Sequence, residues 1–122
     1  MRKVVLAIFI LVAGCTPSSS SDADLTLSEF SIESAASTID SGVVKLDVVN
    51  TGEFGHTVVV ADSTGRVVSA SPLIQSGERT TLELDLEPGL YEFTCRIVFQ
   101  SEDGTVVDHY EEGMHTRIDV EE

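Results

Sequence analysis

Short runs of alternating hydrophobic and polar residues, separated by turn-forming residues, occupy the chain from Leu25 onward. The clearest run is 81–86, in which every second residue is leucine and the intervening residues are polar, as in a half-buried strand. No segment here has the period of a helix. Evenly spaced short strands of this kind predict an all-β sandwich or barrel. Strands are expected at residues 25–32, 43–49, 56–61, 66–70, 80–86, 89–98, 105–110 and 115–120.

The first residues have a different pattern, that of an export signal. Arg2 and Lys3 precede the hydrophobic run 4–12, and the small residues Ala13 and Gly14 follow it. The run is too short to cross a bilayer, which takes about 20 apolar residues. The pattern therefore predicts secretion rather than a membrane span.

Two small residues directly before Cys15 resemble the bacterial lipobox. This resemblance implies a signal peptide over residues 1–14 and a lipid on Cys15, which would hold the protein at the periplasmic or extracellular face of the cell envelope. The alternative is an ordinary cleaved signal with an incidental cysteine. The Ser-rich composition that follows predicts a flexible tether over 15–24, ahead of a single domain at 25–122.

The predicted mature chain is strongly acidic. It has five Lys plus Arg against 21 Asp plus Glu, a net charge of −16. This balance argues against nucleic acid as a partner and favours a basic protein partner or a salty environment, although a merely soluble acidic surface accounts for it equally well. We expect a monomer.

Lipid on Cys15 would leave Cys95 without a disulfide partner in its own chain. An unpaired cysteine in an exported protein is a dimer bridge, a reactive thiol, a buried small side chain or a metal ligand. His109 and Met114 follow Cys95, and His56 precedes it. One thiolate, two imidazoles and one thioether form the ligand set of a blue-copper centre.

With this set, the chain from Leu25 to Val120 resembles the cupredoxins, the small blue copper proteins that include plastocyanin, pseudoazurin and the halocyanins. The resemblance implies a Greek-key β-sandwich that holds one copper ion. His56 would be the first imidazole ligand, Cys95 the thiolate, His109 the second imidazole and Met114 the axial thioether. The Asn-containing loop 50–55 before His56 matches the family pattern, as does the spacing from His109 to Met114.

One departure from the family lies between Cys95 and His109, where thirteen residues replace the usual few. Residues 96–100 and 105–108 have strand patterns and flank Ser-Glu-Asp-Gly, a four-residue hairpin loop signal. We expect an extended hairpin in which Gln100 pairs with Thr105, which would return the chain to the copper site. A smaller departure is Thr57, where many relatives have Asn.

Further residues are expected around the site. Phe54, Tyr91 and Phe93 are candidates for an apolar shell that excludes water, with sandwich core as the plainer role of Phe93. His115 follows Met114 but should point away from the metal. An acidic cluster would surround the second imidazole and favour a basic redox partner. It comprises Glu102, Asp103, Asp108, Glu111 and Glu112.

These features predict an electron-transfer protein that cycles between Cu(I) and Cu(II) and serves membrane-associated redox partners. Enzymatic activity is not expected, because no nucleophile with a His and an acid at useful spacing is present. Two alternatives remain open at this point. One is a lipoprotein that stores or delivers copper, and the other is a metal-free immunoglobulin-like structural lipoprotein.

Overall fold

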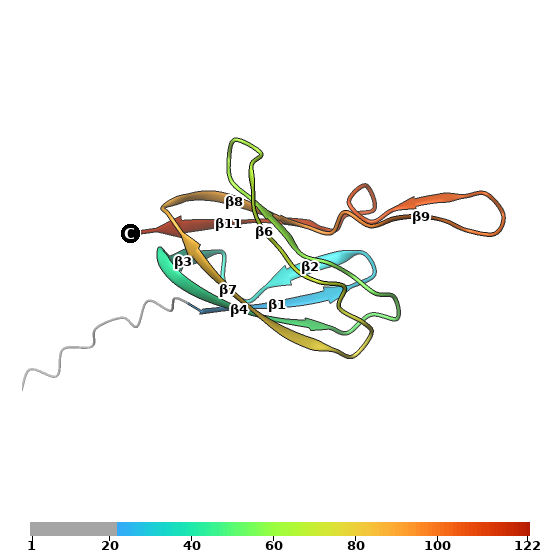
Figure 1. Ribbon diagram of the computed structural model, residues 1–122, viewed down its shortest axis with the longest axis horizontal. Helices are drawn as coiled ribbons and strands as arrows, with labels where there is room; N and C mark the ends of the chain where they lie inside the picture. The colour runs from blue at the N-terminus through green and yellow to red at the C-terminus, as the bar shows by residue number, and fades with distance from the viewer. Residues whose placement is uncertain (1–21) are drawn as a thin grey trace, which may run out of the picture.

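The computed structural model describes residues 22–122, which form two β-sheets and a projecting hairpin (Figure 1). The predicted signal peptide, Cys15 and the tether up to residue 21 lie outside the described residues. Within the described part, no helix has the length and hydrophobicity of a membrane span. The strands are β1 (Asp22–Ser28), β2 (Ser31–Ser34), β3 (Thr38–Asp40), β4 (Gly42–Asn50), β5 (Val59–Ala61), β6 (Val67–Ala70), β7 (Arg79–Leu86), β8 (Gly89–Thr94), β9 (Val98–Gln100), β10 (Val106–Asp108) and β11 (His115–Glu121).

The two sheets pack face to face and bury the alternating hydrophobic residues between them. One sheet has the strand order β2-β1-β4-β7 and the other β3-β11-β8-β5-β6. Side chains from both sheets, including Leu25, Leu46, Phe93 and Ile118, have no solvent exposure. Burial of this apolar area is the main favourable contribution to folding. The predicted all-β sandwich is confirmed.

Strand boundaries differ from the prediction near the start of the domain. Residues 22–24, predicted to be tether, belong to β1, because Ala23 continues its inward-facing row and is buried. The predicted strand 25–32 is two strands, which reverse direction at Glu29 and Phe30 and pair antiparallel. The short strand β3 was not predicted; it pairs in parallel with β11.

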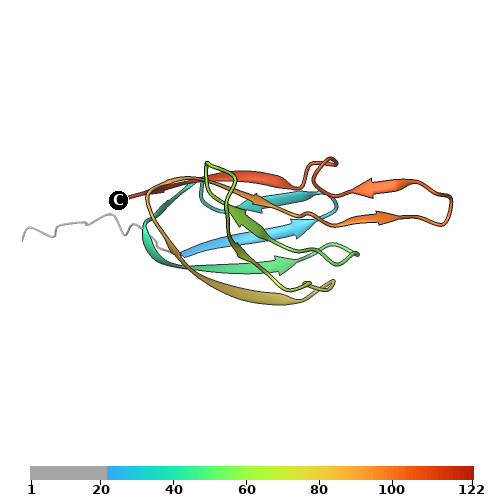
Figure 2. The same ribbon diagram turned by 45° about the horizontal axis from the view of Figure 1, so that its top comes forward.

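The predicted extended hairpin is present as β9 and β10. It projects from the sandwich at the end opposite the C-terminus (Figure 2). Its predicted register is wrong by one residue, because Gln100 pairs with Val106 rather than with Thr105. The physical reason is a five-residue loop. The N–H of Ser101 donates to the carbonyl of Thr105 at 2.8 Å, and the Asp103 carboxylate accepts from the N–H of Thr105 at 2.9 Å.

Candidate metal centre

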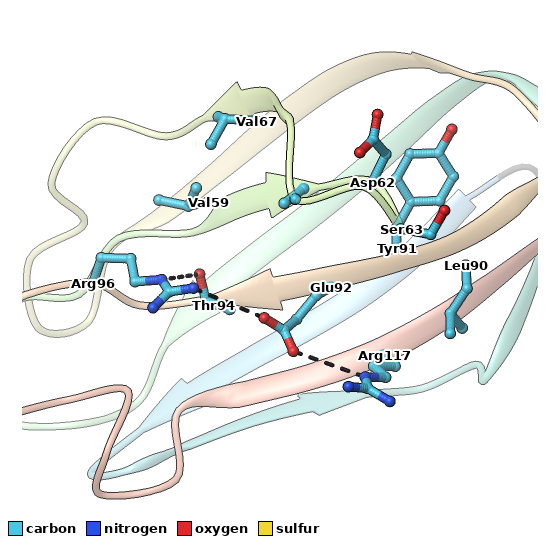
Figure 3. A pocket seen from close by; sticks show the side chains of 12 residues that line it. Val59, Asp62, Ser63, Val67, Leu90, Tyr91, Glu92, Thr94, Arg96 and Arg117 are labelled. Atoms are coloured by element: carbon cyan, nitrogen blue, oxygen red, sulfur yellow. Dashed lines mark hydrogen bonds and ion pairs between the residues drawn. The ribbon is translucent and has the colours of Figure 1, made fainter.

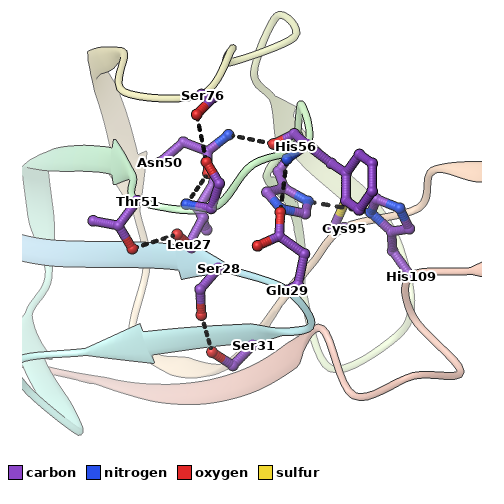
Figure 4. Close-up of polar contacts among 12 residues, drawn as sticks. Leu27, Ser28, Glu29, Ser31, Asn50, Thr51, His56, Ser76, Cys95 and His109 are labelled. Carbon is purple, nitrogen blue, oxygen red and sulfur yellow. Dashed lines mark hydrogen bonds and ion pairs between the residues drawn. The ribbon is translucent and has the colours of Figure 1, made fainter.

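Three of the four predicted ligands lie together at the end of the sandwich from which the hairpin departs. Ligand atoms of His56, Cys95 and His109 all lie within 4.8 Å of one another, and the three side chains are buried. The two imidazole Nδ1 atoms are 3.2 Å apart, and Nδ1 of His109 is 3.5 Å from the Cys95 Sγ (Figure 4). Three donors that are distant in the sequence therefore converge on one point.

His56 is positioned by a backbone bridge and by the loop that precedes it. Instead of opening a strand, as predicted, it forms an isolated bridge with Ile74, with N–H to carbonyl distances of 3.0 and 2.8 Å. Asn50 shapes the preceding loop, because its buried amide donates to the carbonyls of Phe54 at 2.7 Å and Ile74 at 2.9 Å. Its Oδ1 accepts from the N–H of Gly52 at 2.9 Å. The loop is thus closed by one side chain.

Cys95, His109 and Met114 belong to one hydrogen-bonded backbone unit. The N–H of Met114 donates to the carbonyl of His109, and the N–H of Cys95 donates to the carbonyl of Met114, both at 3.0 Å. Gly113 permits this tight turn through a φ of +122°, a value that side-chain-bearing residues rarely adopt. Met114 is fully buried, and these two backbone hydrogen bonds join it to the segments that carry Cys95 and His109.

The observed hairpin register explains how His109 reaches Cys95. Strand residues alternate between faces, so a shift of one residue moves a side chain to the other face. Extending the predicted pairing would have opposed His109 to Arg96 and placed it on the face away from Cys95. In the structure, the N–H of His109 donates to the carbonyl of Ile97 at 3.0 Å, and His109 lies on the same side as Cys95.

Aromatic rings enclose the imidazole of His109. The ring of Phe30 lies 5.1 Å from it and that of Phe99 5.7 Å, both edge-on. Phe54, a predicted shell residue, is half-exposed and packs on Phe99 at 6.1 Å. Burial lowers the pKa of His109, and the nearby imidazole of His56 lowers it further. The neutral form, which binds metals, is therefore favoured at His109.

The two imidazoles differ in their remaining ring nitrogen. Nε2 of His109 is buried and has no hydrogen-bond partner among the described residues. Nε2 of His56 lies 3.2 Å from a carboxylate oxygen of Glu29. The pKa of Glu29 is lowered, chiefly because the backbone N–H of Phe54 donates to its carboxylate. Glu29 was not predicted, because a single acid in a tight turn carries no sequence signal for a site.

Thr57 contacts the sulfur of Cys95. Its backbone N–H lies 3.5 Å and its hydroxyl oxygen 3.8 Å from Sγ. Hydrogen bonds to a ligating sulfur tune the electronic properties of a metal centre. Both the main chain and the hydroxyl of Thr57 therefore lie close enough to interact with this sulfur.

The remaining predicted neighbours lie elsewhere. Tyr91 is not part of the shell, because its hydroxyl donates to the carbonyl of Glu87 at 2.9 Å, at the other end of β8. Phe93 is sandwich core, and His115 is exposed, with its ring 4.9 Å from that of Tyr110 and tilted by 41°. Residues missed by the sequence reasoning include Phe30, Ile97 and Phe99. Of these, Ile97 and Phe99 share the His109 face in the observed register.

The donors fit the metal that the cupredoxin resemblance implies. A first-row metal bound by imidazole and thiolate at about 2.0–2.3 Å holds its donors roughly 3–4 Å apart. The measured separations of 3.2 and 3.5 Å fall in this range. A buried soft thiolate with two imidazoles suits copper in either oxidation state, whereas hard cations prefer oxygen ligands.

A separate groove lies on the outer face of the five-stranded sheet (Figure 3). It has a volume of about 630 Å³. Glu92 lies at its centre, 3.9 Å from Arg96 and 3.8 Å from Arg117. Because residues alternate along β8, this groove opens on the face opposite Cys95 and contributes nothing to the metal centre.

Comparison with known proteins places this geometry in a family. No curated protein matches the sequence. Among solved structures, a dithionite-reduced auracyanin from Roseiflexus castenholzii matches with a TM-score of 0.66 and 16% identity, covering 85% of this chain and 99% of that one. Rusticyanin from Thiobacillus ferrooxidans matches with a TM-score of 0.61 and 18% identity, covering 84% and 79%.

A third structure is auracyanin A, described as a "blue" copper protein, from Chloroflexus aurantiacus. It matches with a TM-score of 0.60 and 13% identity, covering 81% of this chain and 98% of that one. At these identities the structural matches establish a shared fold. The sequence profile of the cupredoxin-like domain matches residues 4–107, most of the chain, and stops just before His109. This protein therefore belongs to the cupredoxin-like domain family.

Proposed function

We propose that this protein is a copper-binding electron carrier, and not an enzyme, that shuttles single electrons between membrane-associated redox partners. The observation that carries the proposal is the convergence of His56 Nδ1, Cys95 Sγ and His109 Nδ1 in a buried site. Met114 would supply a fourth donor, its thioether sulfur. When bound, copper supplies one-electron chemistry between Cu(I) and Cu(II).

The protein contributes a rigid set of donor atoms in a site that excludes water. Cys95 and Met114 provide soft donors that suit Cu(I), and the two imidazoles suit Cu(II). The donors come from a bridged loop and from a hydrogen-bonded turn, so the chain holds them in place. Phe30 and Phe99 exclude water from the ring of His109. A cage that suits both oxidation states needs little rearrangement when an electron is gained or lost.

Copper delivery is the nearest alternative function. It would require an open site from which the ion is handed on. The enclosed donors support electron transfer instead, since His56 and Cys95 have no solvent exposure and His109 is 1% exposed. Family membership likewise supports a metal centre over a metal-free structural lipoprotein.

Absorption spectroscopy tests the proposal. Purified protein that is loaded with one equivalent of Cu(II) is expected to show an intense visible band from thiolate-to-copper charge transfer. The band should disappear on reduction and return on oxidation over repeated cycles. A delivery protein would instead show weak colour or hold only Cu(I), and a structural protein would bind no stoichiometric copper; either result contradicts electron transfer.

The proposed location is the periplasmic or extracellular face of the cell envelope, with a lipid on Cys15 as the anchor. The support for it is the sequence pattern of residues 1–15. Mass spectrometry of the native protein's first peptide tests this proposal. An acylated cysteine at its amino terminus is the expected result, and an unmodified residue there would contradict it.

We propose a basic surface on the redox partner, because acidic side chains lie in the turn that follows His109 and in the loop of the projecting hairpin. Two of the predicted cluster have structural tasks. Asp103 caps the hairpin loop, where hydrogen bonds led by that from the Ser101 hydroxyl lower its pKa to about 2, and Asp108 accepts from the N–H of Tyr110 at 3.0 Å. Glu102, Glu111 and Glu112 are exposed and available to a partner.

Salt should therefore weaken partner association. With a small basic haem protein as the probe, we expect the bimolecular electron-transfer rate constant to fall by about tenfold or more between low and high ionic strength. Stopped-flow mixing measures it. The double variant Glu111→Gln with Glu112→Gln should flatten this dependence, whereas Glu33→Gln with Glu83→Gln removes the same charge elsewhere and should not. A rate that does not respond to salt would contradict the docking proposal.

A further inference from the structure

Glu29 lies in the tight turn between β1 and β2 and reaches across to the metal centre from the other sheet (Figure 4). Its Oε1 accepts a hydrogen bond from the N–H of Phe54 at 2.7 Å and lies 3.2 Å from Nε2 of His56. The Glu29 side chain is 24% exposed, whereas that of His56 is fully buried. One carboxylate thus contacts both the loop that carries His56 and the imidazole itself.

This contact decides which nitrogen of His56 carries the proton. An ionised carboxylate only accepts hydrogen bonds, so a neutral imidazole that bonds to it must have its proton on Nε2. The lone pair is then on Nδ1, the atom that points at Cys95 and His109. His109 has no comparable partner among the described residues. Glu29 therefore distinguishes the two imidazoles.

We propose that Glu29 is a positioning residue that holds His56 in its metal-binding tautomer and orientation, and that its negative charge favours Cu(II) over Cu(I). The inference rests on the proposed copper site. Partners of this kind orient metal-binding histidines and raise their basicity. A fixed negative charge near the centre stabilises the more positive oxidation state, because the electrostatic attraction is larger for the higher charge.

Gly52 makes room for this carboxylate. A β-carbon at position 52 would collide with both carboxylate oxygens of Glu29. The backbone of Gly52 is held in place, since its N–H donates to Asn50 and its carbonyl accepts from the hydroxyl of Ser76. Because Glu29 is flexible, Gly52→Ala should displace its carboxylate and leave the chain's charge unchanged.

The tautomer is tested first, in the metal-free protein. Nitrogen-15 NMR of the histidine side chains of the full chain should show His56 with its proton on Nε2. In Gly52→Ala this preference for Nε2 should weaken. The control is Glu33→Gln, which removes an exposed glutamate from β2, and this variant should keep the preference. A wild-type His56 with its proton on Nδ1, or an unchanged preference in Gly52→Ala, would overturn the proposed positioning role.

The copper-loaded protein tests the charge effect. Glu29→Gln keeps the shape of the side chain and should lower Cu(II) affinity by about 10–100-fold. The affinity for Cu(I) should fall less than the affinity for Cu(II). The reduction potential should therefore rise by about 59 mV for each factor of ten by which the loss of Cu(II) affinity exceeds the loss of Cu(I) affinity. Competition titrations and voltammetry measure these quantities, with Glu33→Gln as the control.

The outcomes separate this inference from the copper proposal. If the wild-type chain binds no copper, the proposed function fails, while the NMR experiment still judges how Glu29 acts on His56. A different outcome is that the wild-type chain shows the visible band, while Glu29→Gln and Glu33→Gln have the same reduction potential and the same ratio of Cu(II) to Cu(I) affinity. Copper binding would then stand, and the charge effect of Glu29 would be refuted.

Discussion

Replacing Cys95 with serine is expected to abolish the intense visible band of the copper-loaded protein. The band requires a thiolate donor, and Cys95 is a free, buried thiol whose Sγ lies 3.5 Å from Nδ1 of His109. A serine hydroxyl is a harder donor that stays protonated, so Cu(I) affinity should fall by more than about 100-fold, beyond the usual effect of changing a neighbour of a ligand. Absorption spectra and competition titrations measure both losses.

The matched control for this variant is Thr94→Ser, which changes the adjacent buried residue of the same segment and keeps its hydroxyl. It should retain the band. Thermal unfolding of the metal-free proteins checks that both variants fold, because serine is close to cysteine in size. A visible band of full intensity in Cys95→Ser would show that the thiolate is not a ligand.

Asn50→Ala is expected to cost about 2–4 kcal/mol of unfolding free energy, a large part of the about 5–15 kcal/mol typical of a domain. Asn50 is fully buried, and its side chain makes hydrogen bonds to Phe54, Ile74 and Gly52. Alanine removes all three and leaves the buried N–H of Gly52 without a partner. The carbonyl of Ile74 keeps its bond from the N–H of His56, which limits the loss.

Urea denaturation of the metal-free protein measures this cost. Thr51→Ala serves as the control, because it removes one hydrogen bond from a neighbouring exposed residue, to the carbonyl of Leu27 at 3.1 Å. That change should cost less than about 1 kcal/mol. If the two substitutions lowered the free energy of unfolding equally, Asn50 would not be the residue that holds the loop before His56 in place.

Hydrophobic alternation predicted the sandwich because it is a local signal with a direct physical cause. The leucines of β7 and the aromatic residues Tyr91 and Phe93 of β8 follow it closely. Short or tightly turned elements escaped prediction. β3 has three residues and depends on β11, far along the chain, and the reversal at Glu29 interrupts an otherwise continuous strand pattern.

The chemistry of the candidate site was predictable from residue types, and its geometry was not. His56, Cys95 and His109 were identified from their donor atoms, and the structure brings those atoms together. The hairpin register depends on a loop that has five residues rather than four, a difference settled by the hydrogen bonds of Ser101 and Asp103. Glu29 contacts His56 from a distant part of the chain, and no local sequence pattern predicts such a contact.

The layout of the strands gives the molecule a polarity along its long axis. β8 and β11 pair so that Gly89 is opposite Val120 near the carboxyl end, while Cys95 follows the far end of β8 (Figure 1). β1 starts at the same end as Val120, because β1 leads toward the hairpin end whereas β11 leads away from it. In a protein attached to a bilayer through the residues before Asp22, the donor atoms would lie at the end of the domain opposite the attachment. Electron exchange with membrane-associated partners would then require redox groups of those partners that extend into the aqueous phase, away from the lipid.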